Sequence, residues 1–315
     1  TPDTISTWRD IPAVPVEAHK DQLLFAWRPD EAVRVFRTSG TTQGMRGSNF
    51  LHTLRLYDAA LWQSFQAMML PDGARDFLCA FLVQPPPNAP DSSLSHMLGT
   101  VIDVLDPSQR PFVMSTEGIN VGRVESLCTS AVDNGLPLLL CATAFALARF
   151  FELSKLSFAL PAGSRVMETG GFKGHVSTYD RGSLYDAIPA RLGIPLTHIV
   201  SEYGMTELSS QCYSGALRAA MCGDVEAEGL TPAPWLRVRV VDPETGLEMP
   251  RGAPGLIQFL DLANLDTVAC VYTSDMGRMV GENQLELMGR LPGADRRGCS
   301  LQAAEILGEV EPEEY

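Results

Sequence analysis

Residues 201–207 read SEYGMTE and follow directly on the apolar run at 197–200. The apolar run predicts a short strand, and Gly204 predicts a turn at its end. A turn that carries a tyrosine, a threonine and a glutamate there is typical of the ligand-binding edge of an open α/β sheet. The tyrosine can stack on a base, the threonine can donate to a phosphate oxygen, and the glutamate can hold Mg²⁺. Taken alone, the same residues also fit a capped helix start.

A second segment, TSGTTQG at 38–44, follows an expected strand from Val33 to Phe36. Its glycines let the backbone approach a phosphate, and successive N–H groups with Ser and Thr hydroxyls can hold an anion. The spacing differs from that of a P-loop, and no lysine follows it. The alternative interpretation is a surface turn rich in Ser and Thr.

A third group lies towards the C-terminal end, with TSDMG at 273–277, Gly289-Arg290, and DRRGCS at 295–300. An aspartate at a strand end can accept both ribose hydroxyls, and an arginine can reach sugar or phosphate. A β-turn with Asp and Gly in their usual positions is the alternative.

The rest of the chain predicts an α/β fold, because expected strands alternate with helices as in a mostly parallel sheet with helices on both faces. From Trp235 onward, strand-like segments separated by Pro/Gly turns predict a small antiparallel β subdomain. The expected domains are 1–230, 231–290 and 291–315. The expected elements are a helix at Leu51–Met69, strands at Phe77–Val83, Leu156–Leu160 and Thr197–Ser201, and a strand and helix dividing 136–151 at Ala142-Thr143.

Composition excludes several classes of protein. The 315 residues carry a net charge of −14, which argues against a protein that mainly covers nucleic acid or anionic lipid. The longest apolar run, at 136–148, is shorter than the ~20 residues of a membrane span. The seven cysteines lack the spacing of a zinc site, and a reducing cytoplasm is the expected location. The chain starts at Thr1 without a signal-peptide pattern, so we expect a truncated or processed N-terminus.

In their order and spacing, these motifs resemble those of the adenylate-forming superfamily of acyl-CoA synthetases and peptide-synthetase adenylation domains. The resemblance is strongest to the acyl-protein synthetase (LuxE-type) family and covers essentially the whole chain. It rests on IPAVPV at 11–16, SGTTQG at 39–44, ETGGFKG at 168–174 and RGCSL at 297–301. The implied fold is an α/β core with a small antiparallel β subdomain and without the large C-terminal lid domain.

The resemblance implies that ATP and Mg²⁺ activate a carboxylic acid, fatty or aryl, as an acyl-adenylate, which a thiol then captures. In this interpretation Thr206 contacts the α-phosphate and Glu207 binds Mg²⁺. The implied nucleotide-binding residues are Ser39, Gly40, Thr41, Thr42 and Gly44 at the β- and γ-phosphates, Gly170, Gly171, Tyr203 and Gly204 around adenine, and Asp275 and Arg290 at the ribose.

The thiol acceptor is less well defined. The family resemblance implies the last cysteine, Cys299, whose neighbours Arg296 and Arg297 would lower a thiol pKa, with a partner reductase or carrier protein as the receiver. Coenzyme A or a carrier-protein thiol is the alternative acceptor. A nucleotide-binding protein without catalysis is a third hypothesis, suggested by Ser274, where the superfamily usually has Thr or Gly.

Lysine is scarce, since Lys20, Lys155 and Lys173 are the only three in the chain. The 25 residues after Arg290 contain none, so we expect that this chain does not supply the lysine of the superfamily lid. Activation would then depend on Mg²⁺, the arginines, a partner subunit or Lys173, which can place a positive charge near phosphate or carboxylate. A solvated loop lysine is the alternative role for Lys173.

Overall fold

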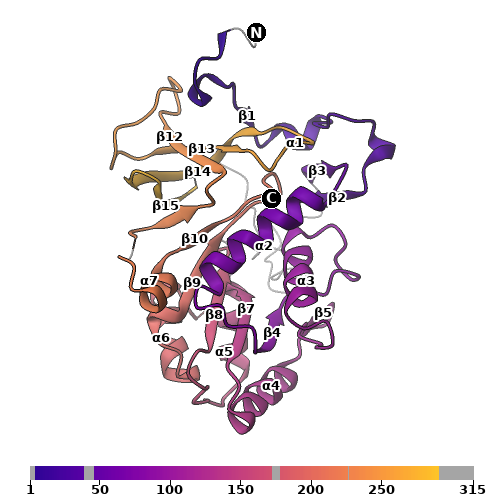
Figure 1. The fold of residues 1–315 in the computed structure, drawn as a ribbon, viewed down its shortest axis with the longest axis vertical. Coiled ribbons are helices and arrows are strands. Elements are labelled where there is room, and N and C mark those ends of the chain that lie inside the picture. The colour runs from indigo at the N-terminus through magenta and orange to yellow at the C-terminus, as the bar shows by residue number, and fades with distance from the viewer. Residues whose placement is uncertain (1–3, 39–45, 172–177, 226, 291–315) are drawn as a thin grey trace, which may run out of the picture.

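A sheet of eleven strands runs through the part of the chain described by this computed structural model, residues 4–38, 46–171, 178–225 and 227–290 (Figure 1). The strands are β1 (Val14–Pro15), β4 (Leu78–Leu82), β7 (Leu138–Thr143), β8 (Arg165–Thr169), β9 (Ile199–Tyr203), β10 (Cys212–Ser214), β11 (Leu230–Pro232), β12 (Leu236–Val241), β13 (Gly255–Asp261), β14 (Cys270–Gly281) and β15 (Gln284–Arg290). They lie in the order β12-β13-β14-β15-β11-β10-β9-β8-β7-β4, and β1 pairs with β14.

Four neighbouring strands, β4, β7, β8 and β9, run parallel. All six residues of β7 are buried, as expected for a strand covered on both faces. Its side chains alternate, so that Leu138 and Leu140 pack in one core cluster while Leu139 and Cys141 pack in another. The predicted mostly parallel core is therefore confirmed.

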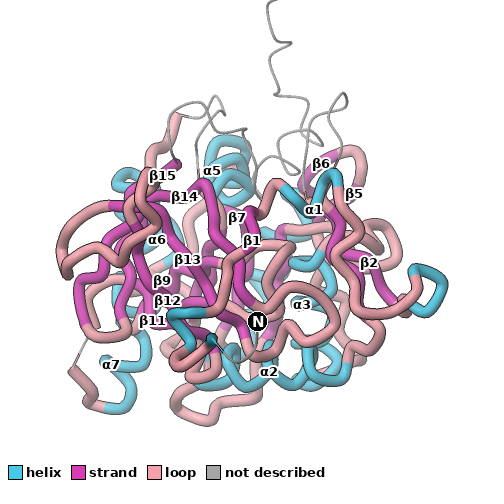
Figure 2. The backbone as a smooth tube through the Cα atoms, turned by 90° about the horizontal axis from the view of Figure 1, so that it is seen from above, coloured by secondary structure: helices cyan, strands magenta, loops and turns pink. Residues whose placement is uncertain are grey.

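Helices cover both faces of the parallel strands, as Figure 2 shows for α5 and α2 on opposite sides. One face packs against α4 (Val121–Asn134), α5 (Ala144–Leu153) and α6 (Arg181–Leu192). The other face packs against α2 (Arg55–Met69), α3 (Ser93–Leu105) and α7 (Ala216–Cys222), and α1 (Ala18–Asp21) is a single short turn near the N-terminal end. No helix in the described residues is both long and apolar enough to reach across a membrane.

Local sequence explains where the helices begin and end. The Thr143 hydroxyl accepts from the Ala146 backbone N–H at 3.1 Å, which starts α5 where β7 ends. Asp180 and Ser183 form a capping box at the start of α6, and Gly193 ends that helix with a φ of 70°. The predicted division at Ala142-Thr143 is therefore confirmed.

The second half of the sheet is antiparallel. Strands β12, β13, β14 and β15 pair antiparallel in sequence order, and their inner face buries residues such as Val238, Phe259 and Val271. Strands β11 and β10 connect β15 to β9, so the sheet continues without a break into the parallel strands. The predicted antiparallel pairing is confirmed, whereas the domain boundaries at 230 and 290 stay predictions.

Two small ribbons and several single turns complete the described fold. One ribbon pairs β2 (Arg34–Arg37) with β3 (Ser48–Leu51), close to the expected strand at 33–36. The other ribbon pairs β5 (Met114–Ser115) with β6 (Gly118–Ile119). The 3₁₀ turns are Trp8–Asp10, Pro29–Glu31 and Leu196–His198.

Three sequence predictions need correction. Residues 156–160 form no strand, because their backbone N–H groups at Phe158 and Leu160 donate to carbonyls at the end of α6 instead. The expected strand at 197–201 lies at Ile199–Tyr203, after the 3₁₀ turn, and the helix expected from Leu51 begins at Arg55.

Candidate functional site

The site lies where the parallel strands β8 and β9 end. Thr169, the last residue of β8, pairs with Glu202 of β9. Gly170 follows with a φ of 74°, a backbone conformation that favours glycine. A Cβ built on Gly171 would have no described atom within 4 Å, apart from its chain neighbours. The backbone at Gly171 is therefore open among the described residues, at the edge where open α/β sheets bind ligands.

Tyr203 connects this edge to the antiparallel strands. Its hydroxyl donates to Asp275 Oδ2 at 2.9 Å, and Arg290 Nε donates to Asp275 Oδ1 at 2.8 Å. Asp275 and Arg290 are cross-strand partners on β14 and β15. Burial, and then the nearby Asp275 carboxylate, raise the pKa of Tyr203 well above its usual range. The structure therefore brings together three residues that the sequence analysis assigned to adenine and ribose.

The loop after β9 carries Thr206 and Glu207. Asn49 of β3, fully buried, donates through Nδ2 to the Thr206 carbonyl at 2.8 Å. Glu207 is buried, and its backbone carbonyl accepts from Asn264 Nδ2 at 2.9 Å. These contacts hold the loop between the β2–β3 ribbon and the turn that follows β13.

The same loop is anchored further along by Asp261, the last residue of β13. Its carboxylate accepts from the Ser209 N–H at 2.9 Å and from the Ser210 hydroxyl at 2.7 Å. The Trp235 indole donates to the Ser210 hydroxyl at 2.9 Å. Burial raises the pKa of Asp261. Since this fixed loop bears Thr206 and Glu207, their positions depend on the antiparallel strands as well as on β9.

Seven predicted site residues lie outside the residues that the structure describes. The residues on either side of the segment 39–45 are described. The Thr38 N–H donates to the Gly47 carbonyl at 2.9 Å, the Gly47 N–H donates to the Thr38 hydroxyl at 2.9 Å, and Arg46 pairs with Asp91 at 2.6 Å. Between these flanks the chain carries the hydroxyl and glycine segment. The seven residues are Ser39, Gly40, Thr41, Thr42, Gly44, Lys173 and Cys299.

The sequence analysis missed a buried carboxylate on β8, Glu168. Its Oε1 accepts from the Tyr185 hydroxyl at 2.9 Å and lies 3.4 Å from the Arg181 guanidinium. The guanidinium also donates to the Ser201 hydroxyl at 3.0 Å. Burial raises the pKa of Glu168, and it also raises the pKa of Tyr185 to about 12. This network ties the start of α6 to the ends of β8 and β9.

A second missed carboxylate, Glu202, lies inside the SEYGMTE segment itself. It is 7% exposed, and burial is the main cause that raises its pKa to about 7. A Cβ at Gly204 would stand 2.6 Å from Glu202 Oε1, so this glycine makes room for the carboxyl group. The available signal was a glutamate at the end of an apolar strand, because a strand buried on both faces rarely carries a charge without a function.

The candidate Mg²⁺ site fits the residues present. Within the described ranges, His, Cys, Asp and Glu side chains form no group of three or more that could hold a metal ion by themselves. Mg²⁺ bound with a nucleotide commonly uses one or two carboxylates together with phosphate oxygens and water. Glu207 beside Thr206 is a carboxylate of this kind, so the residues present are compatible with such an ion.

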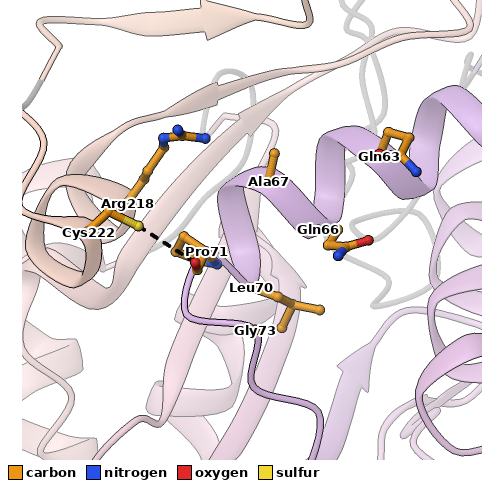
Figure 3. A pocket seen from close by; sticks show the side chains of 8 residues that line it. All are labelled: Gln63, Gln66, Ala67, Leu70, Pro71, Gly73, Arg218 and Cys222. Carbon is orange, nitrogen blue, oxygen red and sulfur yellow. Dashed lines mark hydrogen bonds between the residues drawn. The ribbon is translucent and has the colours of Figure 1, made fainter.

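A separate pocket of about 290 Å³ lies at the other end of the strands (Figure 3). Residues of α2, α7 and the turn at 71–73 line it, including Gln63, Arg218 and Cys222. The adjacent Asp72 pairs with Arg165 at the start of β8, whereas the site described above follows the end of that strand. Ligands of open α/β sheets bind at the carboxyl ends, so this pocket is distinct from the candidate site.

The fold is similar to that of solved adenylate-forming enzymes. ATP-bound MatB from Rhodopseudomonas palustris gives a TM-score of 0.58 at 16% identity over 84% of this chain and 49% of MatB. The amide bond synthetase McbA from Marinactinospora thermotolerans gives 0.56 at 18% identity over 86% and 51%. The o-succinylbenzoate coenzyme A synthetase MenE from Bacillus subtilis, in complex with AMP, gives 0.52 at 18% identity over 84% and 50%. The chain therefore shares their fold and spans about half of their length.

Sequence comparison identifies the family. No curated protein sequence matches the chain. The family model described as "Acyl-protein synthetase, LuxE" matches residues 105–308, which is more than half of the chain and includes Tyr203, Asp275 and Arg290. The chain belongs to the acyl-protein synthetase (LuxE) family.

Proposed function

We propose that this protein uses ATP to activate a carboxylic acid, fatty or aryl, as an acyl-adenylate and passes the acyl group to a protein thiol. The observation that carries the proposal is that Tyr203 and Arg290 both hydrogen-bond to Asp275, close to the glycine end of β8. Tyr203 and Asp275 are 72 residues apart, yet they meet at the edge where this type of sheet binds ligands. Family membership and the ATP- and AMP-bound structures of similar fold support the choice of nucleotide.

In the proposed site, Asp275 binds the ribose. Each carboxylate oxygen has a second acceptor position beyond its bond to Tyr203 or Arg290, so both oxygens can accept a ribose hydroxyl. Gly170 and Gly171 leave space on one side of the adenine and Tyr203 contacts the other. The arrangement would hold the nucleotide with its phosphates directed to the loop that carries Thr206.

Thr206 and Glu207 would act at the phosphates. The threonine hydroxyl would donate to the α-phosphate, and Glu207 would help to hold Mg²⁺, which supplies positive charge against the phosphates. We assign Ser39, Gly40, Thr41, Thr42 and Gly44 to the β- and γ-phosphates and Lys173 to an electrostatic role at the same site. The acid carboxylate attacks the α-phosphorus and pyrophosphate leaves, so catalysis consists mainly of positioning and charge neutralisation.

Cys299 is the proposed acceptor thiol. Burial raises the pKa of both Cys79 and Cys128 to about 12, and that of Cys141 and Cys212 well above the ordinary thiol value, which leaves them unsuited to nucleophilic attack. Cys222 is exposed but lies at the distant pocket of Figure 3. In the transfer step the Cys299 thiolate attacks the acyl carbonyl and AMP leaves.

The proposed partners follow from this chemistry. A reductase or a carrier protein would receive the acyl group from the thioester. Because the described cysteines are all free thiols, we propose a cytoplasmic location for the reaction. A nucleic-acid partner is not proposed, since the net charge is −14.

A panel of carboxylic acids with ATP and Mg²⁺ tests the activation step. We expect pyrophosphate release, and acyl-hydroxamate formation when hydroxylamine is present. Absence of both with every acid would contradict the proposal and favour a nucleotide-binding protein without catalysis.

Intact mass spectrometry after the same reaction tests the acceptor. We expect a hydroxylamine-labile adduct that persists in the Cys222→Ala control and disappears in Cys299→Ala. Pyrophosphate release without an adduct, together with product formation on coenzyme A or a carrier thiol that Cys299→Ala leaves unchanged, would identify the alternative acceptor.

A further inference from the structure

Two buried hydrogen-bond acceptors adjoin Gly204 at the end of β9. Glu202 Oε1 lies 2.6 Å, and Gln211 Cγ 3.5 Å, from the position that a Cβ on Gly204 would take. Gln211 directly precedes Cys212, which pairs with Tyr203 across β9 and β10. The two side chains therefore approach the same point, Glu202 from the end of β9 and Gln211 from the residue before β10.

Among the described residues the Gln211 acceptor has no hydrogen-bond donor, and the Glu202 carboxyl group has one. Gln211 is 5% exposed, and its Oε1 is buried with no described hydrogen-bond partner. Glu202 is 7% exposed, and the Thr169 side chain is the hydrogen-bond donor that acts on its carboxyl group. A buried acceptor without a donor is destabilising, so the pair is suited to receive a donor from a ligand.

The surroundings do not supply a positive charge to Glu202. The charged neighbour that acts on it is another carboxylate, Glu168 on β8. On β10 its titratable neighbours are Cys212 and Tyr213, whose own pKa values are raised in part by the Glu202 charge. Glu168 disfavours a negative charge on Glu202, and neither Cys212 nor Tyr213 supplies a positive one, so a hydrogen-bond donor or a cation from outside the chain would stabilise the ionised carboxylate.

We propose that Glu202 and Gln211 bind a hydrogen-bond donor, an amino or hydroxyl group, on the carboxylic acid substrate. The inference rests on the proposed function and narrows its substrate class to acids that carry such a donor away from their carboxylate. Glu202 directly precedes Tyr203 of the proposed nucleotide site along β9, and its side chain lies on the sheet face that also carries Met167 and Val200. An unsubstituted acid would leave the Gln211 carbonyl without a donor and the Glu202 carboxyl group with Thr169 alone, and a site built in this way discriminates against such an acid.

Binding of matched acids, measured by titration calorimetry without ATP, tests the inference. The probes are octanoate with its ω-amino and ω-hydroxy derivatives, and benzoate with its para-amino and para-hydroxy derivatives. We expect at least one derivative to bind about tenfold more tightly, or better, than its unsubstituted parent. In the octanoate set the two derivatives distinguish an ammonium from a hydroxyl as the donor, and in the benzoate set they distinguish a neutral aryl amine from a phenolic hydroxyl.

Variants locate the preference. Glu202→Gln removes the charge and Gln211→Met removes the amide acceptor at similar volume, so each is expected to bring the affinity ratio towards one. Glu244→Gln, on the exposed turn after β12, removes a matched charge elsewhere and should leave the ratio unchanged. Thermal unfolding of each variant verifies that it folds. If one variant does not fold, the affinity ratio of derivative to parent acid, measured on the protein without mutations, still tests the inference.

The outcomes separate this inference from the proposed function. Equal binding of parent and derivative, a preference that survives both substitutions, or no binding of any acid would overturn the inference. Pyrophosphate release, measured on the same acids, reports the proposed function independently. Selective binding without pyrophosphate release would refute the proposed function and support the donor site. Pyrophosphate release without any preference in binding would support the proposed function and refute the donor site.

Discussion

Asp275 holds two neighbouring side chains at once, each through a different carboxylate oxygen. Its side chain is 14% exposed, and its partners Tyr203 and Arg290 come from different strands. A single atom also matters at Gly204, because the absence of a Cβ leaves room for the Glu202 carboxyl group. Single atoms at these positions therefore decide how the side chains of Tyr203, Arg290 and Glu202 are placed.

Asp275→Asn is expected to weaken AMP binding about tenfold to a hundredfold and to lower the free energy of unfolding by ~1–3 kcal/mol. The asparagine side chain has a single acceptor oxygen, so it cannot accept hydrogen bonds from Arg290 and Tyr203 and also from two ribose hydroxyls. Calorimetric titration with AMP and urea unfolding measure the two effects. Asp224→Asn is the matched control, because its pair with Arg218 at 2.9 Å is exposed and should contribute less than ~1 kcal/mol. Equal effects in both variants would contradict the role of Asp275.

Gly204→Ala is expected to destabilise the fold by ~1–3 kcal/mol, because its Cβ would displace the Glu202 carboxyl group. The loss of stability should be smaller in a Glu202→Ala background, where the carboxyl group that the new Cβ displaces is missing. Gly122→Ala, on an exposed position of α4 where the nearest atom to the new Cβ is 3.9 Å away, should be neutral or stabilising. Urea unfolding of the double-mutant set measures the coupling, and additive costs would exclude the contact.

At the scale of elements, β8 is held at both ends. Its end is tied to α6 through Glu168, and its start is tied to α2 through Arg165, whose side chain is 1% exposed. Arg165 pairs with Asp72 at 2.8 Å, donates to the Met69 carbonyl at 2.8 Å, and lies 4.8 Å over the Phe77 ring. The strand that carries the glycine end of the site is therefore positioned from the opposite edge of the sheet.

Arg165→Met is expected to lower the free energy of unfolding by about 3 kcal/mol, because it removes one partner of a buried ion pair and leaves the Met69 carbonyl without its donor. Arg278→Met is the control, since its pair with Glu286 at 2.7 Å is well exposed and should contribute under ~1 kcal/mol. Urea unfolding compares the two variants. Similar losses of unfolding free energy in both would show that burial of Arg165 adds nothing to the stability of the fold.

For the whole molecule, two buried groups give opposite dependences of stability on pH. Burial lowers the pKa of His19 to about 4, so its contribution is present above its ordinary value of 6.5 and is lost as pH falls. Burial raises the pKa of Glu202 from 4.5 to about 7, so its contribution is fully present below 4.5 and is lost as pH rises through about 7.

Glu202→Gln is therefore expected to be relatively more stable at high pH. Compared with the unsubstituted chain, its free energy of unfolding should rise by about 3 kcal/mol between about pH 4 and about pH 8. His19 and the other groups titrate in both proteins, so they cancel in the difference. Urea unfolding across this range measures it, and a difference that does not change with pH would show that Glu202 ionises as it does in the unfolded chain.

Part of the fold and site was predictable from local sequence. The apolar run of β7 with its cap at Thr143, and the strand-like segments after Trp235, depend on periodicity and turn residues that lie within a few positions of each other. The prediction at 156–160 was wrong because an apolar segment can bury itself against a helix end as well as in a sheet. The glycine, tyrosine and aspartate motifs were recognisable one by one for the same local reason.

By itself, the sequence determined the alternation of strands and helices, the helix caps and the order of the motifs along the chain. Only the tertiary structure decided that Tyr203 meets Asp275, that Glu202 lies beside Gln211, and that Glu168 is buried. Caps and periodicity act within a few residues. Which strands become neighbours, and how much water then reaches a carboxylate between them, depends on contacts between segments tens of residues apart.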